Sequence, residues 1–430
     1  MSKIKSIKSR EILASGGKPT IETEVVLESG AEGLASVPYG ASAGVHEAVM
    51  LRDEDKNRYG GAGVLKAIEN VHQIIAPELI GMEAENQREI DSKMIELDGT
   101  DNKANLGGNA ILSVSLAVAK AMAAEKQMPL YKYIREAFEL DIDGYYLPNP
   151  MMVIIEGGKH AHNSTDLQEF IVSTYGFDSA KENIRMGEEI YMALKKHLKS
   201  LDLNTNVGNE GAFAPSGLGS NEKPLELIVE AIKLAGYEPG KDAGISLDAA
   251  ASEFFEDGSY NLTIEAKELS SAELIDYYMP WFEKYPIVTV EDMLHEDDWE
   301  FWPKFTEKCP VPNIGDDLLV TNVERLERAI KEKACDAVLV KLNQIGSLSE
   351  TIDCCMLARE NGMMTVPSHR GGGEVNDTSM VDVAVAVNAG FIKVGPARGE
   401  RVCKYNRLME IEAELGDKAK VQGADFASVK

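Results

Sequence analysis

The sequence predicts an α/β protein in which a smaller front unit precedes a barrel of the (β/α)8 type. Apolar runs in the second half each end at a charged or imidazole residue, at Asp248, Glu291, Asp316, Lys341, His369 and Lys393. Their spacings of 43, 25, 25, 28 and 24 residues fit repeated strand–helix units. Short apolar runs without alternation are typical of strands buried on both faces in a parallel sheet. The chemistry of such barrels lies at the carboxyl ends of the strands.

The front of the chain predicts a separate α+β unit over residues 1–138. Residues 1 to about 38 alternate in the manner of strands, as in TIETEVVLESG and AEGLASVPYG, and Glu-Ser-Gly at 28–30 predicts a hairpin turn. The Gly- and Ala-rich loop GASAGVHEA follows at 40–48, and then helical patterns. The segment 109–125 is apolar almost all round, which indicates a core helix between the two domains.

A Gly- and Pro-containing junction at 139–150 separates this unit from the predicted barrel at 151–416. The barrel should begin with MMVIIEGG and LQEFIVST, followed by an amphipathic helix at about 179–200. The Gly- and Asn-rich stretch 204–224 is long for a loop, and long loops in compact domains are usually functional. The tail, 417–430, is small and polar, and we expect it to be weakly ordered.

Composition narrows the class of partner. The chain of 430 residues has a net charge of −27 and a pI near 4.7, which disfavours nucleic acid and anionic membranes. A small anionic substrate remains possible because a metal and lysines can reverse the field inside a pocket. The five cysteines form no CxxC pair, no apolar segment follows the basic start, and no run is long enough to span a membrane. We therefore expect a cytoplasmic protein with reduced thiols.

The three strand-end carboxylates Asp248, Glu291 and Asp316 predict a metal site. One such acid could simply cap a helix, but three converging carboxylates would repel one another unless a cation compensated them. Oxygen-only ligation favours Mg²⁺ over Zn²⁺. Asp292 and Asp317 follow these acids directly, so strand alternation would point them to the other face, in a supporting role.

Two lysines, Lys341 and Lys393, are predicted to face the same mouth. A metal and a second ammonium nearby would lower a lysine pKa and supply a neutral amine as a base. Glu169 and Glu210, if paired in pocket-facing loops, could share a proton as a general acid, although each alone is more often structural. His160 and His369 are weak signals alone, but SHRGGGE at 368–374 indicates an anion contact.

Taken together, these motifs resemble the enolase family over most of the chain, from SREIL at 9–13 to the segment near 415. The matching blocks are GASAGVHEA, NAILSVSLAVAKA, GGKHA, LQEF, GNEGAFAP, SLDAAASEF, YPIVTVED, GDDLLVTN, LVKLNQIGSLSET, SHR and IKVG. The resemblance implies an α+β domain on a modified barrel, two Mg²⁺ per active site, and a homo-oligomer, either a dimer or a ring of dimers.

The resemblance also implies roles in dehydrating 2-phospho-D-glycerate. The first Mg²⁺ would be bound by the carboxylate trio, Asp248, Glu291 and Asp316, and the second by Ser42. Lys341 would remove the C2 proton, and Glu210, supported by Glu169, would assist loss of the C3 hydroxyl. The substrate would be held by Lys393, Arg370, Ser368 and Ser42, with His160 and His369 lining the pocket.

Several positions depart from the family pattern. ASGGKPT stands at 14–20 where DSRGNPT is usual, which puts the usual subunit contact in doubt. Glu156 replaces Asn, Gly371 replaces Ser, GNEGA replaces GDEGG, and GPARGER is one residue short. Three readings follow: an enolase, a paralogue that eliminates water from another 2-substituted carboxylate, or a non-catalytic protein on an enolase fold.

Overall fold

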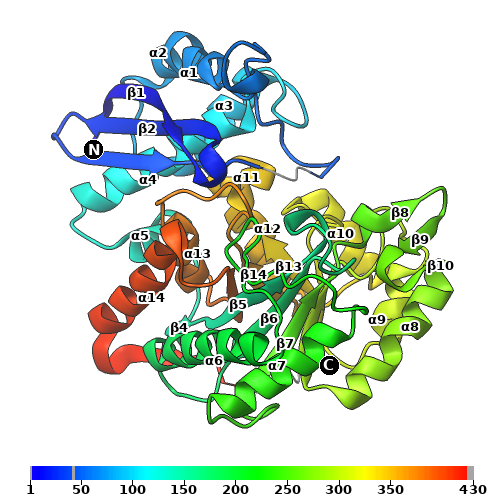
Figure 1. Cartoon of the computed structure of the whole chain (residues 1–430). Helices are drawn as coiled ribbons and strands as arrows, with labels where there is room; N and C mark the ends of the chain where they lie inside the picture. The colour runs from blue at the N-terminus through cyan, green and yellow to red at the C-terminus, as the bar shows by residue number, and fades with distance from the viewer. Residues whose placement is uncertain (1, 41–43, 424–430) are drawn as a thin grey trace.

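A computed structural model describes residues 2–40 and 44–423, and its first unit is an antiparallel sheet backed by helices (Figure 1). The strands are β1 (Ile4–Leu13), β2 (Pro19–Leu27) and β3 (Glu32–Ser36), paired in that order. The helices are α1 (Leu65–Asn70), α2 (Ala76–Leu79), α3 (Gln87–Asp98), α4 (Gly108–Glu125) and α5 (Leu130–Ala137). A π-helical segment, Val71–Ile75, joins α1 to α2.

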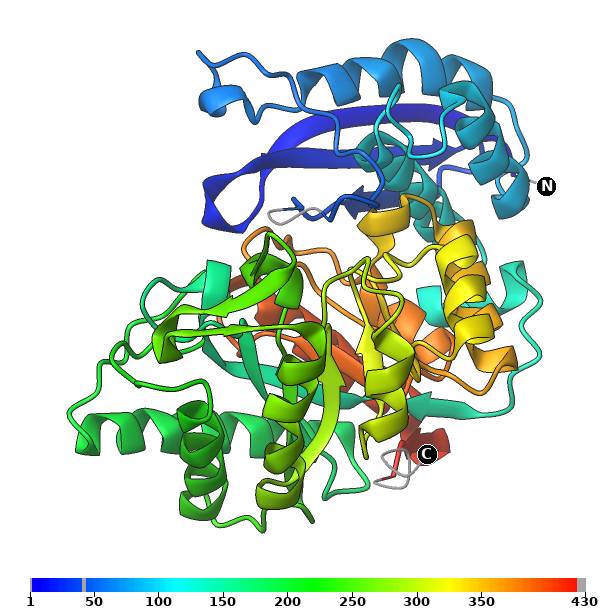
Figure 2. The same cartoon turned by 90° about the vertical axis from the view of Figure 1, so that its right-hand side faces the viewer.

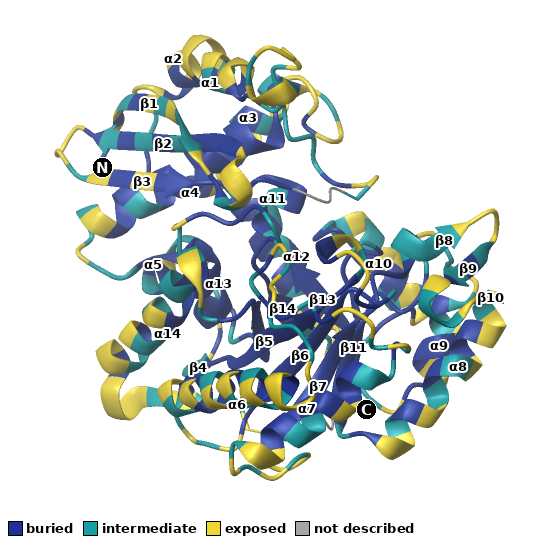
Figure 3. Cartoon of the chain, viewed as in Figure 1, coloured by how far each residue is buried: buried dark blue, intermediate teal, exposed yellow. Residues whose placement is uncertain are grey.

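Helix α4 lies between the N-terminal sheet and the barrel helices α11 (Leu342–Ile345) and α12 (Leu348–Glu360). Nearly all of its side chains are buried, as the apolar sequence predicts. One side contacts β2 and β3, and the other contacts the barrel (Figure 3). Gly33 permits the close approach of β3, because a Cβ there would stand 2.0 Å from the Ala117 carbonyl oxygen. The helix therefore joins the two units through shared packing.

The second unit is a barrel whose strands, within the described residues, form an eight-stranded sheet. Around the ring the order is β14 (Met364–Pro367), β13 (Ala337–Val340), β12 (Asn313–Gly315), β11 (Ile287–Glu291), β7 (Ala243–Asp248), β6 (Glu169–Thr174), β5 (Asn149–Glu156) and β15 (Phe391–Val394). A parallel bridge between Ser368 and Lys393 joins β14 to β15. The ring is thus closed, and the α/β barrel class is confirmed.

Helices surround this ring on the outside (Figure 3). They are α6 (Ala180–Ser200), α7 (Lys223–Leu234), α8 (Ser271–Lys284), α9 (Trp302–Lys308), α10 (Val323–Glu332), α12 (Leu348–Glu360), α13 (Ser379–Ala386) and α14 (Val402–Leu415). The short helix α11 (Leu342–Ile345) follows β13 at the mouth and contacts α4. A small β-meander, β8 (Phe255–Glu256), β9 (Ser259–Leu262) and β10 (Lys267–Leu269), projects after β7. No helix in the described part of the chain has both the length and the apolar character needed to cross a membrane.

One strand departs from a regular repeat of parallel units. β6 is antiparallel to both β5 and β7. The segment between β5 and β6, residues 157–168, contains a single 3-10 turn and no crossover helix, so the chain returns directly. As a result, β5 ends at the barrel mouth and β6 begins there, with Glu156 opposite Glu169.

The beginning of the tail is more ordered than we expected from its composition. Residues Ala419–Val421 form β16, which pairs in parallel with β4 (Tyr145–Leu147). Beyond the strand, the Gln422 N–H donates to the Leu147 carbonyl oxygen at 3.1 Å. Backbone pairing with the junction explains this order, since it needs no large side chains.

Candidate active site

The charged strand-end residues converge on one mouth of the barrel. The N-terminal unit lies over this end (Figure 2), where the Tyr39 N–H donates to the Gly373 carbonyl oxygen at 2.7 Å. The cavity at the mouth is small, about 30 Å³, because ion pairs fill it. The predicted site residues that line it are His160, Glu169, Glu210, Asp248, Asp316, Lys341, Ser368, His369, Arg370 and Lys393. Ser42 lies outside the described residues.

Lys393 lies among three carboxylates. Its Nζ is 2.9 Å from Glu169 Oε2, 2.9 Å from Asp248 Oδ2 and 2.7 Å from Glu291 Oε1. Burial alone would lower the pKa of Lys393, but these carboxylates outweigh burial and hold it well above its usual value. The Lys393 ammonium therefore links the acids of β6, β7 and β11.

Lys341 is paired with Asp316. Its Nζ donates to Asp316 Oδ2, and Gln344 Nε2 donates to Asp316 Oδ1 at 2.8 Å. From the sequence we expected a lowered pKa for Lys341. Burial does act in that direction, but the Asp316 carboxylate outweighs it and raises the Lys341 pKa. A cation that neutralised Asp316 would withdraw this stabilisation of the ammonium.

The carboxylates of β7, β11 and β12 fit a hard divalent cation. They are held within reach of the same two lysines, and Glu291 Oε2 is buried with no hydrogen-bond partner among the described residues. Burial, followed by the charge of Asp248, raises the pKa of Glu291 well above its usual value. An oxygen-rich site with excess negative charge and an unsatisfied oxygen suits Mg²⁺. Asp248, Glu291 and Asp316 are the residues that would hold it.

Asp292 and Asp317 do not point away from this mouth, contrary to our expectation. β11 ends at Glu291 and β12 at Gly315, so strand alternation no longer governs the residues that follow. Asp292 has a φ of 43°, and its carboxylate accepts the N–H groups of Asp316 at 2.9 Å and Asp317 at 2.7 Å. Both carboxylates line the cavity with Asp316. Asp292 therefore fixes the direction in which the chain leaves β12.

A second cluster of acids surrounds His160 and shares Glu169 with the group around Lys393. His160 Nδ1 lies 3.4 Å from Glu169 Oε1, 3.6 Å from Glu210 Oε1 and 3.9 Å from Glu156 Oε2. His369 Nε2 is 3.3 Å from Glu210 Oε2. Glu156 contacts neither His162 nor Lys159 in the described structure; Lys159 instead pairs with Glu253. Three carboxyl groups and two imidazoles therefore share one buried space.

These carboxyls have different proton affinities. Burial, followed by the charge of Glu210, raises the pKa of Glu156 to about 8 and that of Glu169 well above its usual value. Burial would also raise the pKa of Glu210, but its interaction with the His369 imidazole holds it well below the usual range. Burial lowers the pKa of both histidines. These shifts favour protonation of Glu156 and Glu169 and ionisation of Glu210.

Arg370 has a carboxylate partner that sequence reasoning missed. Its guanidinium donates to Glu47, with Nη1–Oε2 at 2.9 Å and Nη2–Oε1 at 3.1 Å. Gln344 Nε2 also lies 3.3 Å from Glu47 Oε1. Glu47 belongs to the block GASAGVHEA and Gln344 to LVKLNQIG, so the motifs pointed to both residues without indicating their contacts. Glu47 compensates the charge of the residue expected to hold the anion.

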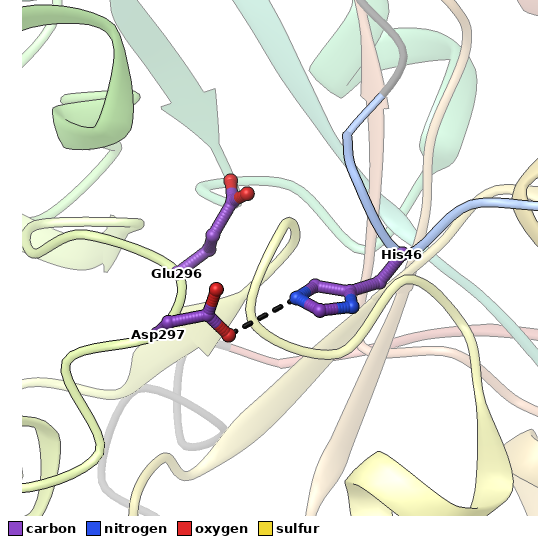
Figure 4. Close-up of side chains that lie close together, drawn as sticks. All are labelled: His46, Glu296 and Asp297. Carbon is purple, nitrogen blue, oxygen red and sulfur yellow. Dashed lines mark hydrogen bonds and ion pairs between the residues drawn. The ribbon is translucent and has the colours of Figure 1, made fainter.

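His46 attaches the loop after residue 43 to the barrel (Figure 4). Its Nε2 lies 3.0 Å from Asp297 Oδ1, beside Glu296. Arg325 Nη2 lies 3.4 Å from the same Asp297 oxygen. A guanidinium already compensates this acidic pair, so the group acts as a contact between the two units.

Fold and site together define a class: a capped α/β barrel whose mouth carries carboxylates for a divalent cation, paired lysines and a separate acid cluster. Two protein-family models match the chain and define the same class. The enolase N-terminal domain matches residues 4–134, and the enolase C-terminal TIM barrel domain matches residues 144–430. The chain belongs to the enolase family. Its membership and its acidic barrel mouth support an enolase-type lyase that uses Mg²⁺.

Proposed function

We propose that the protein catalyses the Mg²⁺-dependent dehydration of 2-phospho-D-glycerate to phosphoenolpyruvate, in the cytoplasm and as a homo-oligomer. The observation that carries the proposal is the position of the groups around the ring. Lys341 follows β13 and Glu169 begins β6, four strands away in a closed ring of eight. A candidate base and a candidate acid cluster therefore face each other across the mouth.

The two arcs between them have different chemistry. One arc, formed by β7, β11 and β12, carries Asp248, Glu291 and Asp316. The other, formed by β14, β15 and β5, carries the cationic residues Arg370 and Lys393 and ends at Glu156. Mg²⁺, when bound, supplies positive charge that stabilises a substrate carboxylate on which negative charge is building. Ser42 is the proposed ligand of a second Mg²⁺.

In this arrangement Lys341 removes the C2 proton, and its neutral form is favoured once Asp316 is engaged elsewhere. Glu210, supplied with a proton from the cluster that includes Glu169, donates it to the C3 hydroxyl, which leaves as water. Lys393 contacts the substrate carboxylate. Arg370 releases Glu47 and, together with Ser368, binds the substrate phosphate in its place. His160 and His369 hold the Glu210 carboxylate in place.

Phosphoenolpyruvate formation followed by ultraviolet absorbance tests the proposal. With Mg²⁺ we expect turnover that EDTA abolishes and that Lys341→Ala lowers by roughly 10²–10⁴-fold. Lys304→Ala, which changes an exposed lysine on α9, is the matched control. Turnover that survives Lys341→Ala would remove Lys341 from the role of base.

A second candidate function is the same elimination on a different 2-substituted carboxylate. It is favoured by Glu156, an extra buried carboxyl on the acid side, and by the compensation of Arg370 by Glu47. Mg²⁺ binding without turnover of 2-phosphoglycerate, but with turnover of another acid, would select it. Calorimetric Mg²⁺ binding with no turnover of any acid in such a panel would favour a non-catalytic protein.

A further inference from the structure

Two positions that depart from the family pattern, Glu156 and Gly371, both contact the same functional group. Glu156 ends β5, whereas Gly371 lies in the loop after β14. They are far apart in the chain, and nothing in the sequence relates them. In the structure both lie against Glu210: Glu156 accepts the Glu210 backbone N–H, and Gly371 leaves the space that the Glu210 side chain occupies.

Glu156 supports the backbone of the Glu210 loop. Its side chain is fully buried, and Oε2 accepts the Glu210 N–H at 3.1 Å. The loop packs directly on this carboxyl, since a Cβ at Gly208 would stand 2.5 Å from Glu156 Cδ. Asparagine, one methylene shorter, could not fill this volume and keep the same acceptor position.

Gly371 makes room for the Glu210 side chain. A Cβ at residue 371 would lie 1.9 Å from Glu210 Oε1 and 2.9 Å from His160 Cε1. The φ of Gly371 is not in the left-handed region, so the requirement is for space and not for backbone freedom. Any larger residue would push the flexible end of Glu210 away from the two imidazoles.

We propose that Glu156 and Gly371 are a coupled pair of positioning residues that together place the Glu210 carboxylate between His160 and His369. The inference rests on the proposed function only in taking Glu210 as the acid. The two departures then act together. The longer side chain of Glu156 supports the backbone of the Glu210 loop, and Gly371 leaves room for the Glu210 carboxylate.

Restoring the usual family residue at only one of the two positions should therefore lower turnover, not raise it. Gly371→Ser alone inserts a Cβ into the position of Glu210 Oε1 and should lower turnover. Glu156→Asn alone leaves the Glu210 N–H without its acceptor and should also lower turnover. With both changes, the Glu210 loop can settle into the space left by the shorter Asn, and its carboxylate can withdraw from residue 371.

A double-mutant cycle tests the coupling. We expect about 100-fold loss of kcat for Gly371→Ser, about tenfold loss for Glu156→Asn, and small changes in KM. The double variant should retain at least about tenfold more activity than the product of the single losses, because contacting residues are not additive. Losses that multiply would overturn the proposal.

Two further variants distinguish a specific role of Glu156 in positioning Glu210 from a general loss of stability. Glu156→Gln keeps an acceptor oxygen for the Glu210 N–H and should retain most of the kcat at pH 6–7. If Glu156→Gln lost as much kcat as Glu156→Asn, the hydrogen bond from the Glu210 N–H would not explain the role of Glu156. Glu188→Gln, in α6, changes another partly buried carboxyl, whose Oε1 accepts the Ala397 N–H, and is the matched control.

NMR spectra recorded without substrate test the position of Glu210 independently of the identity of the substrate. In ¹⁵N spectra of the seven histidines of the full-length chain, the signals of His160 and His369 report the nearby Glu210 carboxylate. We expect both to shift in each single variant and to return toward wild type in the double variant. Restored spectra without turnover of 2-phosphoglycerate would support the pair and reject the substrate. Unchanged spectra in both single variants would reject the pair.

Discussion

Glu156 is a fully buried carboxyl whose proton is held by its surroundings. Its Oε1 has no hydrogen-bond partner within the described chain, and the anionic Glu210 is its neighbour. Ionising such a group costs free energy twice, through desolvation and through repulsion. The pKa of about 8 has the consequence that the folded protein keeps a proton that an unfolded chain releases near pH 4.5.

This difference predicts how Glu156→Gln changes stability with pH. A carboxyl with a raised folded-state pKa contributes its full stability below about pH 4.5 and loses it as the pH rises to about 8. The loss approaches about 1.4 kcal/mol per pH unit within that window. Glutamine has no such loss. Compared with wild type, Glu156→Gln should gain thermal stability between pH 5 and pH 8.

Thermal unfolding of both proteins at several pH values measures the effect. Glu300→Gln, at an exposed position, is the control. A difference in Tm between Glu156→Gln and wild type that stays constant across this range would contradict the proton on Glu156.

At the scale of elements, the described part of the loop from Gly44 onward is attached to the barrel by two side chains, those of His46 and Glu47. Glu47 bonds Arg370, and His46 bonds Asp297 in a half-exposed pair. Exposed pairs of this kind contribute about 0.2–1 kcal/mol, too little to change global stability but enough to change local opening.

We therefore expect His46→Ala to speed amide hydrogen exchange in residues 44–50 by about two- to fivefold, with Tm unchanged to within about 2 °C. His72→Ala, which removes an acceptor of the Ser9 N–H in the N-terminal unit, should leave that segment unaffected. Equal exchange in both variants would mean that the His46 contact does not restrain the loop.

Elements and strand-end residues could be predicted from the sequence because their signals are local. The helix expected at 179–200 is α6, Ala180–Ser200, and each predicted apolar run forms a strand ending at or within two residues of its charged residue. The partner of Arg370 could not be predicted, since Glu47 lies 323 residues away. The direction of Asp292 depends on one backbone angle, and β16 depends on pairing with β4. These features arise from tertiary contact alone.

At the scale of the whole molecule, the two units share a core. α4 packs between the N-terminal sheet and the barrel helices. Buried Asp91 of α3 accepts the N–H and the hydroxyl of Ser349 at 3.0 and 2.6 Å across the same boundary. Separating the units would expose apolar surface and leave these polar groups unsatisfied.

Unfolding should therefore be a single transition. Calorimetry of the full chain should give equal calorimetric and van't Hoff enthalpies. Asp91→Ala should lower the temperature of that one transition. Two resolved transitions in the wild-type protein would show that the N-terminal unit and the barrel unfold independently.

Cation binding should stabilise the whole fold, because the carboxylates that would hold it come from separate strands. At a free Mg²⁺ concentration 100 times its Kd, the expected gain is about 2.7 kcal/mol. EDTA should reverse the rise in Tm, and Asp248→Asn should reduce it, whereas the exposed-site variant Lys304→Ala should keep it. A Tm that does not respond to Mg²⁺ in the wild-type protein would count against the metal site.

The reversed strand β6 has a consequence for how this site can evolve. Because β5 ends and β6 begins at the mouth, Glu156, His160 and Glu169 all lie within one hairpin. The carboxylates proposed to bind the cation instead belong to separate strand–helix units between residues 243 and 316. A short insertion or deletion between β5 and β6 would alter the surroundings of Glu210 without changing the length of any of those strand–helix units. Three members of the acid cluster thus belong to one local segment, whereas the carboxylates proposed to bind the cation are dispersed along the chain.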